Sequence, residues 1–345
     1  MQKPFFSIII PAYNLENYIA AALQSVLVQT FQDFEIIIVD DGSSDETVSI
    51  IQSFHDPRIR LVSQVNGGVS RARNAGMKKA VGAYIAFLDG DDYWYPEHLE
   101  LAADFFNRHP EILAYANRYM RDELEAIPPR PPSYPESIRR LGMRGAIFMH
   151  PSSVILNSSL ASRLPPWEEA MPYGEDGLYW TRCTRGTGLI GLGGSVTSIY
   201  RQRASSAMHD EHYQHISLHS LIAPLLNELE AMKNPKWQFA VHYLVIRELH
   251  PKRLLSLNAE ERISLTGRIR KIMHPCLNRP FLDSYMKACS ARAGMEQSFS
   301  ALMDRTMFSC KWLDRLERMG RSLFFRLQTN NGMESKHQDP VRSRS

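Results

Sequence analysis

The first quarter of the chain alternates short apolar runs with segments of helical periodicity. The apolar runs are Phe5–Ile10, Phe34–Val39, Ile59–Val62 and Tyr84–Leu88. Each has the length of a strand buried on both faces, whereas Tyr18–Val28, between the first two, places its apolar residues on one helical face. Strands that alternate with helices in this way pair in parallel, so the pattern predicts an α/β fold with a mostly parallel sheet.

Polar side chains follow three of these apolar runs. Tyr13 comes after the first run, Asp40 and Asp41 end the second, and Asp89-Gly90-Asp91-Asp92 ends the fourth. The carboxyl ends of parallel strands emerge at one edge of a sheet, and ligands bind there. We therefore expect these side chains to share one site.

The segment Asp89–Asp92, called the acidic turn below, places three carboxylates within four residues. Carboxylates this close repel one another and raise one another's pKa, a cost that a divalent cation removes. Mg2+ or Mn2+ takes oxygen ligands and leaves positions to substrate phosphates, so the pattern indicates a phosphorylated ligand. The alternative is a plain strand-to-helix turn, with Gly90 at positive φ and Asp92 near the start of the helix after Pro96.

Length and composition set the other bounds. At 345 residues the chain predicts one large domain with an appendage, or two domains. A net charge of +3 gives no argument for a nucleic-acid partner. We see no signal-peptide pattern and no apolar run of the about 20 residues that cross a bilayer, and we expect a cytoplasmic protein. The four cysteines lack metal-binding spacing and are expected to be reduced thiols.

The turn after the first strand argues against one common ligand. A dinucleotide-binding Rossmann domain needs Gly-x-Gly-x-x-Gly at this point. The chain has Pro11-Ala12-Tyr13-Asn14 instead, and Pro11 is expected to end the strand. We therefore set the dinucleotide-binding class aside.

Four motifs in the first third of the chain resemble those of the family 2 glycosyltransferases. They are Ile10–Asn14, Val39–Asp45, Asn66–Gly76 and Leu88–Asp92, in the family's order. A fifth motif, Tyr173–Trp180, resembles the Glu-Asp motif that opens a helix beneath the acceptor, although such pairs are also common at ordinary helix starts. The resemblance implies a GT-A fold of the nucleotide-diphospho-sugar transferase type: a Rossmann-like mixed sheet flanked by helices, here with a C-terminal helical extension.

The sequence also suggests how the chain is divided, because from about Met208 its character shifts to helical periodicity. We expect a catalytic domain over residues 1–207, with a nucleotide and metal half (1–117) and an acceptor half (118–207). A helical region would occupy 208–328 and a polar, disordered tail 329–345. The proline-rich stretch Ala126–Ser137 predicts a loop or flap within the acceptor half.

On the donor side, the resemblance implies roles for five residues. Pro11 and Tyr13 would line the slot for the nucleotide base. Asp40 or Asp41 would accept a hydrogen bond from a base N–H, and the choice between them stays open. Arg73 would approach the diphosphate, the alternative being an exposed, solvated arginine.

On the metal and acceptor sides, four carboxylates are implied. Asp91 would bind Mn2+ or Mg2+ directly, with Asp89 nearer the ribose and also at the metal. Asp176 would be the catalytic base, at a helix start whose dipole favours the ionised carboxylate. Glu175 would orient the acceptor or its loop.

The implied activity is inverting transfer of a hexosyl or N-acetylhexosaminyl group from a nucleotide-diphosphate donor, most often a UDP-sugar in this family. The acceptor would be a hydroxyl of a glycan or a lipid-linked acceptor in the synthesis of cell-surface polysaccharide or glycoconjugate. One alternative is a metal-dependent nucleotidyltransferase, which would usually have a glycine-rich, lysine-bearing phosphate loop that this chain lacks. The other is a non-catalytic domain that binds nucleotide-sugar or glycan, which should have lost the carboxylates that this chain keeps.

Several features outside the motifs allow two interpretations. Trp167 is a packing residue by preference, or else a sugar-stacking platform, and His150 is structural by preference, or else faces the acceptor. Histidines at helical spacing favour an exposed polar face over a metal site: His209, His212, His215 and His219. The apolar and basic stripe of residues 311–327 suits either peripheral contact with the inner face of an anionic membrane or packing against protein.

Overall fold

The computed structural model describes residues 3–122, 133, 135–139, 149–171, 173–201, 218–231, 260 and 264. Its strands are β1 Phe6–Ala12, β2 Phe34–Asp40, β3 Ile59–Ser63, β4 Tyr84–Phe87, β5 Tyr93–Trp94, β6 Ala114–Asp122, β7 Ser137–Arg139, β8 Val154–Asn157 and β9 Ile190–Arg201. Its helices are α1 Ile19–Leu27, α2 Thr47–Gln52, α3 Val69–Lys79, α4 His98–Arg108, the 3-10 helix η1 Pro151–Ser153, α6 Ser158–Ala161, α7 Glu175–Thr187 and α9 Leu218–Ala231.

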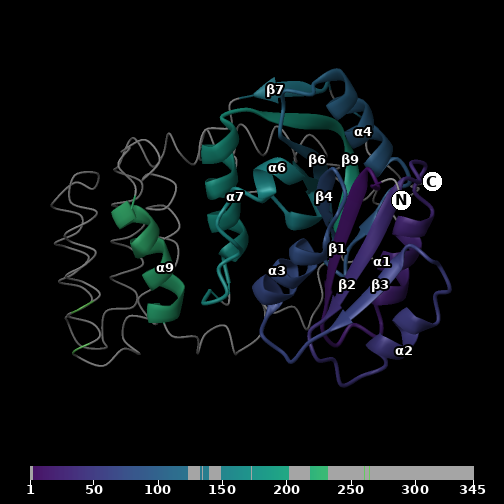
Figure 1. The fold of residues 1–345 in the computed structure, drawn as a ribbon, viewed down its shortest axis with the longest axis horizontal. Helices are drawn as coiled ribbons and strands as arrows, with labels where there is room; N and C mark the ends of the chain where they lie inside the picture. Colours follow the sequence, from purple (N-terminus) through teal and green to yellow (C-terminus); the bar gives the residue numbers. More distant parts are fainter. Residues whose placement is uncertain are drawn as a thin grey trace, which may run out of the picture.

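The strands form one mixed sheet (Figure 1). Within the described residues its order is β3-β2-β1-β4-β8-β6-β9-β5, with β7 paired to β9. The first half is parallel, as the sequence predicts: β1 pairs with β2 and β4, and β2 pairs with β3. In the second half β8 pairs antiparallel with both β4 and β6. The four expected N-terminal strands are therefore present, and the sheet as a whole is mixed.

The strand β1 differs from the prediction because it continues through Pro11 to Ala12. Leu88 donates its N–H to the carbonyl of Ile9, so the backbone groups of Ile9 point toward β4. The backbone groups of Pro11, two residues further along β1, point to the same side. The pairing of β1 with β4 stops at Ile9 opposite Phe87, so Pro11 lies beyond the end of β4. The N–H that proline lacks therefore costs the sheet no hydrogen bond.

The strand β9 contains a glycine-rich passage before Ser195. A side chain at Gly191 would collide with the ring of Phe105, and one at Gly193 would collide with Asn117 and Tyr115. Glycines here therefore let the strand pass close to its neighbours, and they do not mark a loop.

Both faces of the parallel half are covered, which explains its continuous apolar runs. Ile8 and Ile10 lie in the core that includes buried residues of α1 and α4, whereas Ile9 lies in the core on the other face with Trp180 of α7. Figure 1 shows α1 and α2 on one side of the sheet and α3, α6 and α7 on the other. The carboxyl ends of β1, β2 and β4 are thus fixed by packing from both sides.

Trp167 belongs to the second core. Its side chain is 1% exposed. It stacks on Tyr179 with ring centroids 4.1 Å apart and meets the edge of Phe87 at 5.3 Å. The packing interpretation is therefore confirmed, and the sugar-stacking interpretation is wrong because no open ring face remains.

Helix α9 is fastened to α7. Glu228 forms an ion pair with Arg182 at 2.9 Å, and both side chains are about nine-tenths buried. None of the described helices combines the length and hydropathy of a membrane span. The four histidines of 209–219, the stripe 311–327, the tail 329–345 and most of the proline-rich stretch lie outside the described residues.

Candidate active site

The acidic turn is pressed against the loop that follows β1. A Cβ on Gly90 would come within 3.0 Å of the Pro11 carbonyl oxygen and 2.7 Å of Leu15 Cδ1. Positive φ is found at other described glycines and not at Gly90. The expectation of a positive-φ turn is therefore wrong, and Gly90 is required by close approach.

Asp92, the last residue of the acidic turn, is an internal anchor. Its side chain is fully buried, and its two oxygens accept from Ser152 Oγ at 2.6 Å and from the Arg201 N–H at 3.0 Å. Burial, followed by the charges of Asp91 and Asp89, raises its pKa well above the usual range. Strand β5 separates Asp92 from helix α4, which begins at His98 with Glu97 as its cap, so the alternative that Asp92 lies near the start of that helix is wrong.

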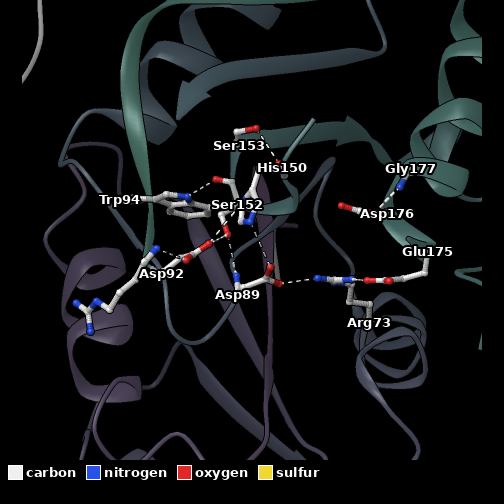
Figure 2. A network of polar contacts seen from close by, with 11 residues as sticks. Arg73, Asp89, Asp92, Trp94, His150, Ser152, Ser153, Glu175, Asp176 and Gly177 are labelled. Atoms are coloured by element: carbon white, nitrogen blue, oxygen red, sulfur yellow. Dashed lines mark hydrogen bonds and ion pairs between the residues drawn. The ribbon is translucent and has the colours of Figure 1, made fainter. Parts of the chain in front are cut away.

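His150 completes a cluster with the acidic turn (Figure 2). Its Nδ1 lies 3.5 Å from Asp92 Oδ2, and its Nε2 lies 4.0 Å from Asp89 Oδ2. Asp89, Asp92 and His150 each offer one ligand atom within 4.8 Å of the others. Two carboxylates and an imidazole suit Mn2+, so this donor set fits a divalent cation. Half-buried Asp91, the predicted direct ligand, is not part of this group.

Sequence reasoning did not place His150 and Ser152 in this cluster. Both residues lie about 60 positions after the acidic turn, at η1. The Ser152 hydroxyl accepts from the Asp89 N–H at 3.0 Å and donates to Asp92. A single His-Pro-Ser sequence has no spacing that would identify it as a ligand set, so only the fold could reveal it.

Asp41 organises the turn that leads into α3. Its carboxylate accepts from the N–H groups of Gly67 (3.0 Å) and Gly68 (2.7 Å) and from Gln64 Nε2 (2.7 Å). Gly68 has a φ of 87°, a conformation that favours glycine. Asp40 is also buried, and it accepts from the Ser43 N–H at 3.0 Å. The two aspartates thus lie together at the end of β2 but make different contacts.

Tyr13 and Pro11 lie at the same edge of the sheet. The Tyr13 side chain is 49% exposed and follows β1, whereas Pro11 is buried. The Asp41 N–H donates to the carbonyl of Ala12 at 2.8 Å. The structure therefore brings Pro11, Tyr13, Asp40 and Asp41 to one edge, as the sequence predicts.

Arg73 differs most from its predicted setting. It is 2% exposed, so the solvated alternative is wrong. Its guanidinium donates to Asp89 Oδ1 at 2.7 Å and to Glu175 Oε1 at 2.9 Å, and it lies over the Trp167 ring at 4.5 Å. Burial alone would lower the pKa of Arg73, but the two carboxylates outweigh it and raise the pKa above the usual range.

Glu175 and Asp176 open helix α7, as predicted. Burial, followed by the charge of Asp176, raises the pKa of Glu175 to about 7, while Arg73 acts in the opposite sense. Asp176 is half-buried and accepts from the Gly177 N–H at 2.6 Å. Figure 2 shows its carboxylate directed toward His150 and Asp89. The Glu175–Asp176 pair and the acidic turn, far apart in sequence, therefore face one site.

Known proteins resemble this chain in sequence. Residues 7–163 match the family model described as glycosyl transferase family 2. The uncharacterized glycosyltransferase EpsJ of Bacillus subtilis is 50% identical over 92 residues, which make up 26% of this chain and 27% of that protein. The chain thus spans about a quarter of the length of that curated relative.

Two solved structures share the fold. Staphylococcus aureus TarS 1-349 in complex with UDP-GlcNAc aligns with a TM-score of 0.62 and 20% identity over 95% of this chain and 93% of that one. The mannosyltransferase PcManGT of Pyrobaculum calidifontis, in complex with GDP-Man and Mn2+, aligns with a TM-score of 0.53 and 14% identity over 84% and 85% of the two chains. Residues 7–163 of the chain thus resemble the family 2 glycosyltransferases, and the fold is GT-A.

Proposed function

We propose that the chain is an inverting glycosyltransferase that moves a hexosyl or N-acetylhexosaminyl group from a UDP-sugar to a hydroxyl of a glycan or lipid-linked acceptor. The observation that carries the proposal is the meeting of the acidic turn with the Glu175–Asp176 pair at one sheet edge, linked through Arg73. The UDP-GlcNAc complex of TarS supports the choice of donor. Synthesis of cell-surface polysaccharide or glycoconjugate is the setting that we propose for this transfer.

The donor pocket is assigned to the end of β1 and β2. Exposed Tyr13 and buried Pro11 would line the base slot. Since the Asp41 carboxylate already accepts from Gly67, Gly68 and Gln64, Asp40 is the better candidate to accept from a base N–H. We assign to Asp41 the task of holding the turn that begins α3.

The cation site is assigned to Asp89 and Asp91, with His150 as a further ligand. Asp89 and His150 belong to the group of donors that fits a divalent cation, and Asp91 replaces Asp92 in this assignment because both Asp92 oxygens are already engaged by Ser152 and Arg201. The PcManGT complex with Mn2+ supports a cation at this site. When bound, such an ion stabilises negative charge on a departing diphosphate. Asp92 is too deeply buried to meet the donor, and it holds Ser152 and the end of β9 in place.

Asp176 is assigned as the base. A direct displacement needs a carboxylate across the sugar from the cation, and Asp176 opens α7, a separate element from the acidic turn, with its carboxylate directed toward His150 and Asp89 (Figure 2). It would take the proton of the attacking hydroxyl, while Glu175, held by Arg73, orients the acceptor or its loop.

Calorimetry with UDP-GlcNAc tests this proposal. Binding of UDP-GlcNAc should be tighter with Mn2+ than with a chelator, because Asp91 and the diphosphate would bind the same ion. Asp91→Ala should abolish that difference. His150→Ala should reduce the Mn2+ effect, whereas Asp104→Ala, at an exposed position on α4, should leave it unchanged. Equal donor affinity with and without Mn2+ would refute the metal assignment.

A further inference from the structure

Arg73 is shared between two motifs that the proposed function assigns to different substrates. Its side chain is 3% exposed, and its two terminal nitrogens bind Asp89 at 2.7 Å and Glu175 at 2.9 Å. Asp89 follows β4, a strand of the parallel half of the sheet, whereas Glu175 is the first residue of α7 and lies 102 positions after Arg73. In the described residues this guanidinium therefore joins the donor side of the site directly to the acceptor side.

The neighbouring residue on α3 strengthens the link. The Asn74 side chain donates to the Trp167 carbonyl at 2.9 Å and accepts from the Trp167 N–H at 2.9 Å. Trp167 in turn lies under Arg73 and stacks on Tyr179 of α7. Helix α3 is therefore held against the Trp167 segment beside Arg73, and one guanidinium contacts both carboxylates.

The charges make the two contacts competitive. Arg73 places a positive charge against Asp89, where the proposed cation would also bind, and two cations compete for one carboxylate. The ion pair with Glu175 partly neutralises Arg73 and so weakens its attraction to Asp89. A bound cation would conversely leave more of the guanidinium charge for Glu175.

We propose that Arg73 is a positioning residue that couples cation binding at Asp89 to the placement of Glu175 beside the acceptor. This inference rests on the proposed function, but it assigns Arg73 a different task from the diphosphate contact that the family resemblance implies. The residue acts through two carboxylates: when a cation binds at Asp89, the contact of Arg73 with Glu175 strengthens.

A double-mutant cycle on Mn2+ affinity tests the coupling with the metal alone as the probe. Calorimetry on the full chain would compare the wild type, Arg73→Met, Glu175→Gln and the double variant. Arg73→Met should bind Mn2+ more tightly, because a competing cation is removed, although its melting temperature should fall. Glu175→Gln should weaken Mn2+ binding at least about threefold in the wild-type background and by less in the Arg73→Met background.

Two comparisons exclude simpler roles. Asp176→Asn removes the same charge one residue away from Glu175 without touching Arg73, so it should change Mn2+ affinity less than Glu175→Gln does. UDP affinity at saturating Mn2+ should stay within about threefold in Arg73→Met, whereas a direct diphosphate ligand would lose more. If Arg73→Met does not fold, Arg73→Gln replaces it in the cycle, since glutamine also removes the positive charge but keeps a side chain that can donate hydrogen bonds.

Each result decides the proposal. Non-additive effects with tighter Mn2+ binding in the Arg73 variant support it. Additive effects in a wild type that binds Mn2+, or weaker Mn2+ binding in Arg73→Met, overturn the coupling alone. A wild type that binds no Mn2+ overturns the metal site of the proposed function and the coupling together.

Discussion

Replacement of Asn74 by alanine tests how the segment around Trp167 is held against α3. The Asn74 amide is 6% exposed and makes hydrogen bonds of 2.9 Å with the N–H and the carbonyl of Trp167 and with Glu169 Oε1. Alanine would leave the two Trp167 backbone groups without these partners. Since Trp167 is 1% exposed, water cannot readily replace them.

The expected loss follows from these contacts. Each buried, unsatisfied backbone group costs about 1–3 kcal/mol, so the two groups together predict a loss of about 2–6 kcal/mol in the free energy of unfolding. Exposed Glu169 can turn to water and adds little. A loss of this size is large against the total stability of an ordinary domain.

Urea unfolding followed by tryptophan fluorescence measures this loss. The midpoint should fall for Asn74→Ala with the slope unchanged, which indicates a change in stability alone. Lys78→Ala, at an exposed position on the same helix, is the matched control and should stay within about 0.5 kcal/mol of the wild type. A loss below about 1 kcal/mol for Asn74→Ala would refute the claim that this amide fastens the Trp167 segment.

Two further predictions concern α7. Asp176→Asn keeps the shape of the side chain but cannot take a proton, so transfer to the true acceptor should fall by on the order of 10^2 to 10^4 while donor affinity stays constant; near-normal turnover, or retained anomeric configuration by NMR of the product, would remove Asp176 from the mechanism. The pKa of Glu175 is raised from 4.5 to about 7, so its stabilising effect is present below pH 4.5 and is lost as pH rises through about 7. In parallel urea titrations, the unfolding free energy of the wild type relative to Glu175→Gln should therefore decrease from about pH 5 to about pH 8. A difference that stays constant with pH would contradict the raised pKa of Glu175.

The sequence predicts the parallel half of the fold well because the evidence there is local. Continuous apolar runs such as Phe34–Val39 identify doubly buried strands, and the parallel arrangement then brings Tyr13, Asp40 and Asp89 to one edge. The antiparallel half was not specified. Which strand β8 pairs with depends on packing across more than 60 positions of sequence, and no local pattern encodes it.

The sequence identifies most residues of the site but not the contacts that they make. The sequence singles out Arg73, but an exposed arginine on a helix and a buried one have the same neighbours in sequence. Its two carboxylate partners lie 16 and 102 positions away, so only the folded chain shows that it is paired. The contact of His150 with the acidic turn could not be predicted for the same reason. The fold brings η1 to that turn, and a single histidine forms no spacing pattern in the sequence.

The ion pair between Arg182 and Glu228 has a practical consequence for the design of protein fragments. A fragment cut at residue 207, where sequence patterns alone would place the end of the catalytic unit, would keep Arg182 with Glu168 at 3.3 Å and the Pro166 carbonyl at 3.1 Å but remove Glu228. One cation inside α7 would then lack its nearest carboxylate, only seven positions after Glu175. A fragment intended for crystallisation or assay should therefore extend beyond Ala231, the last residue of α9.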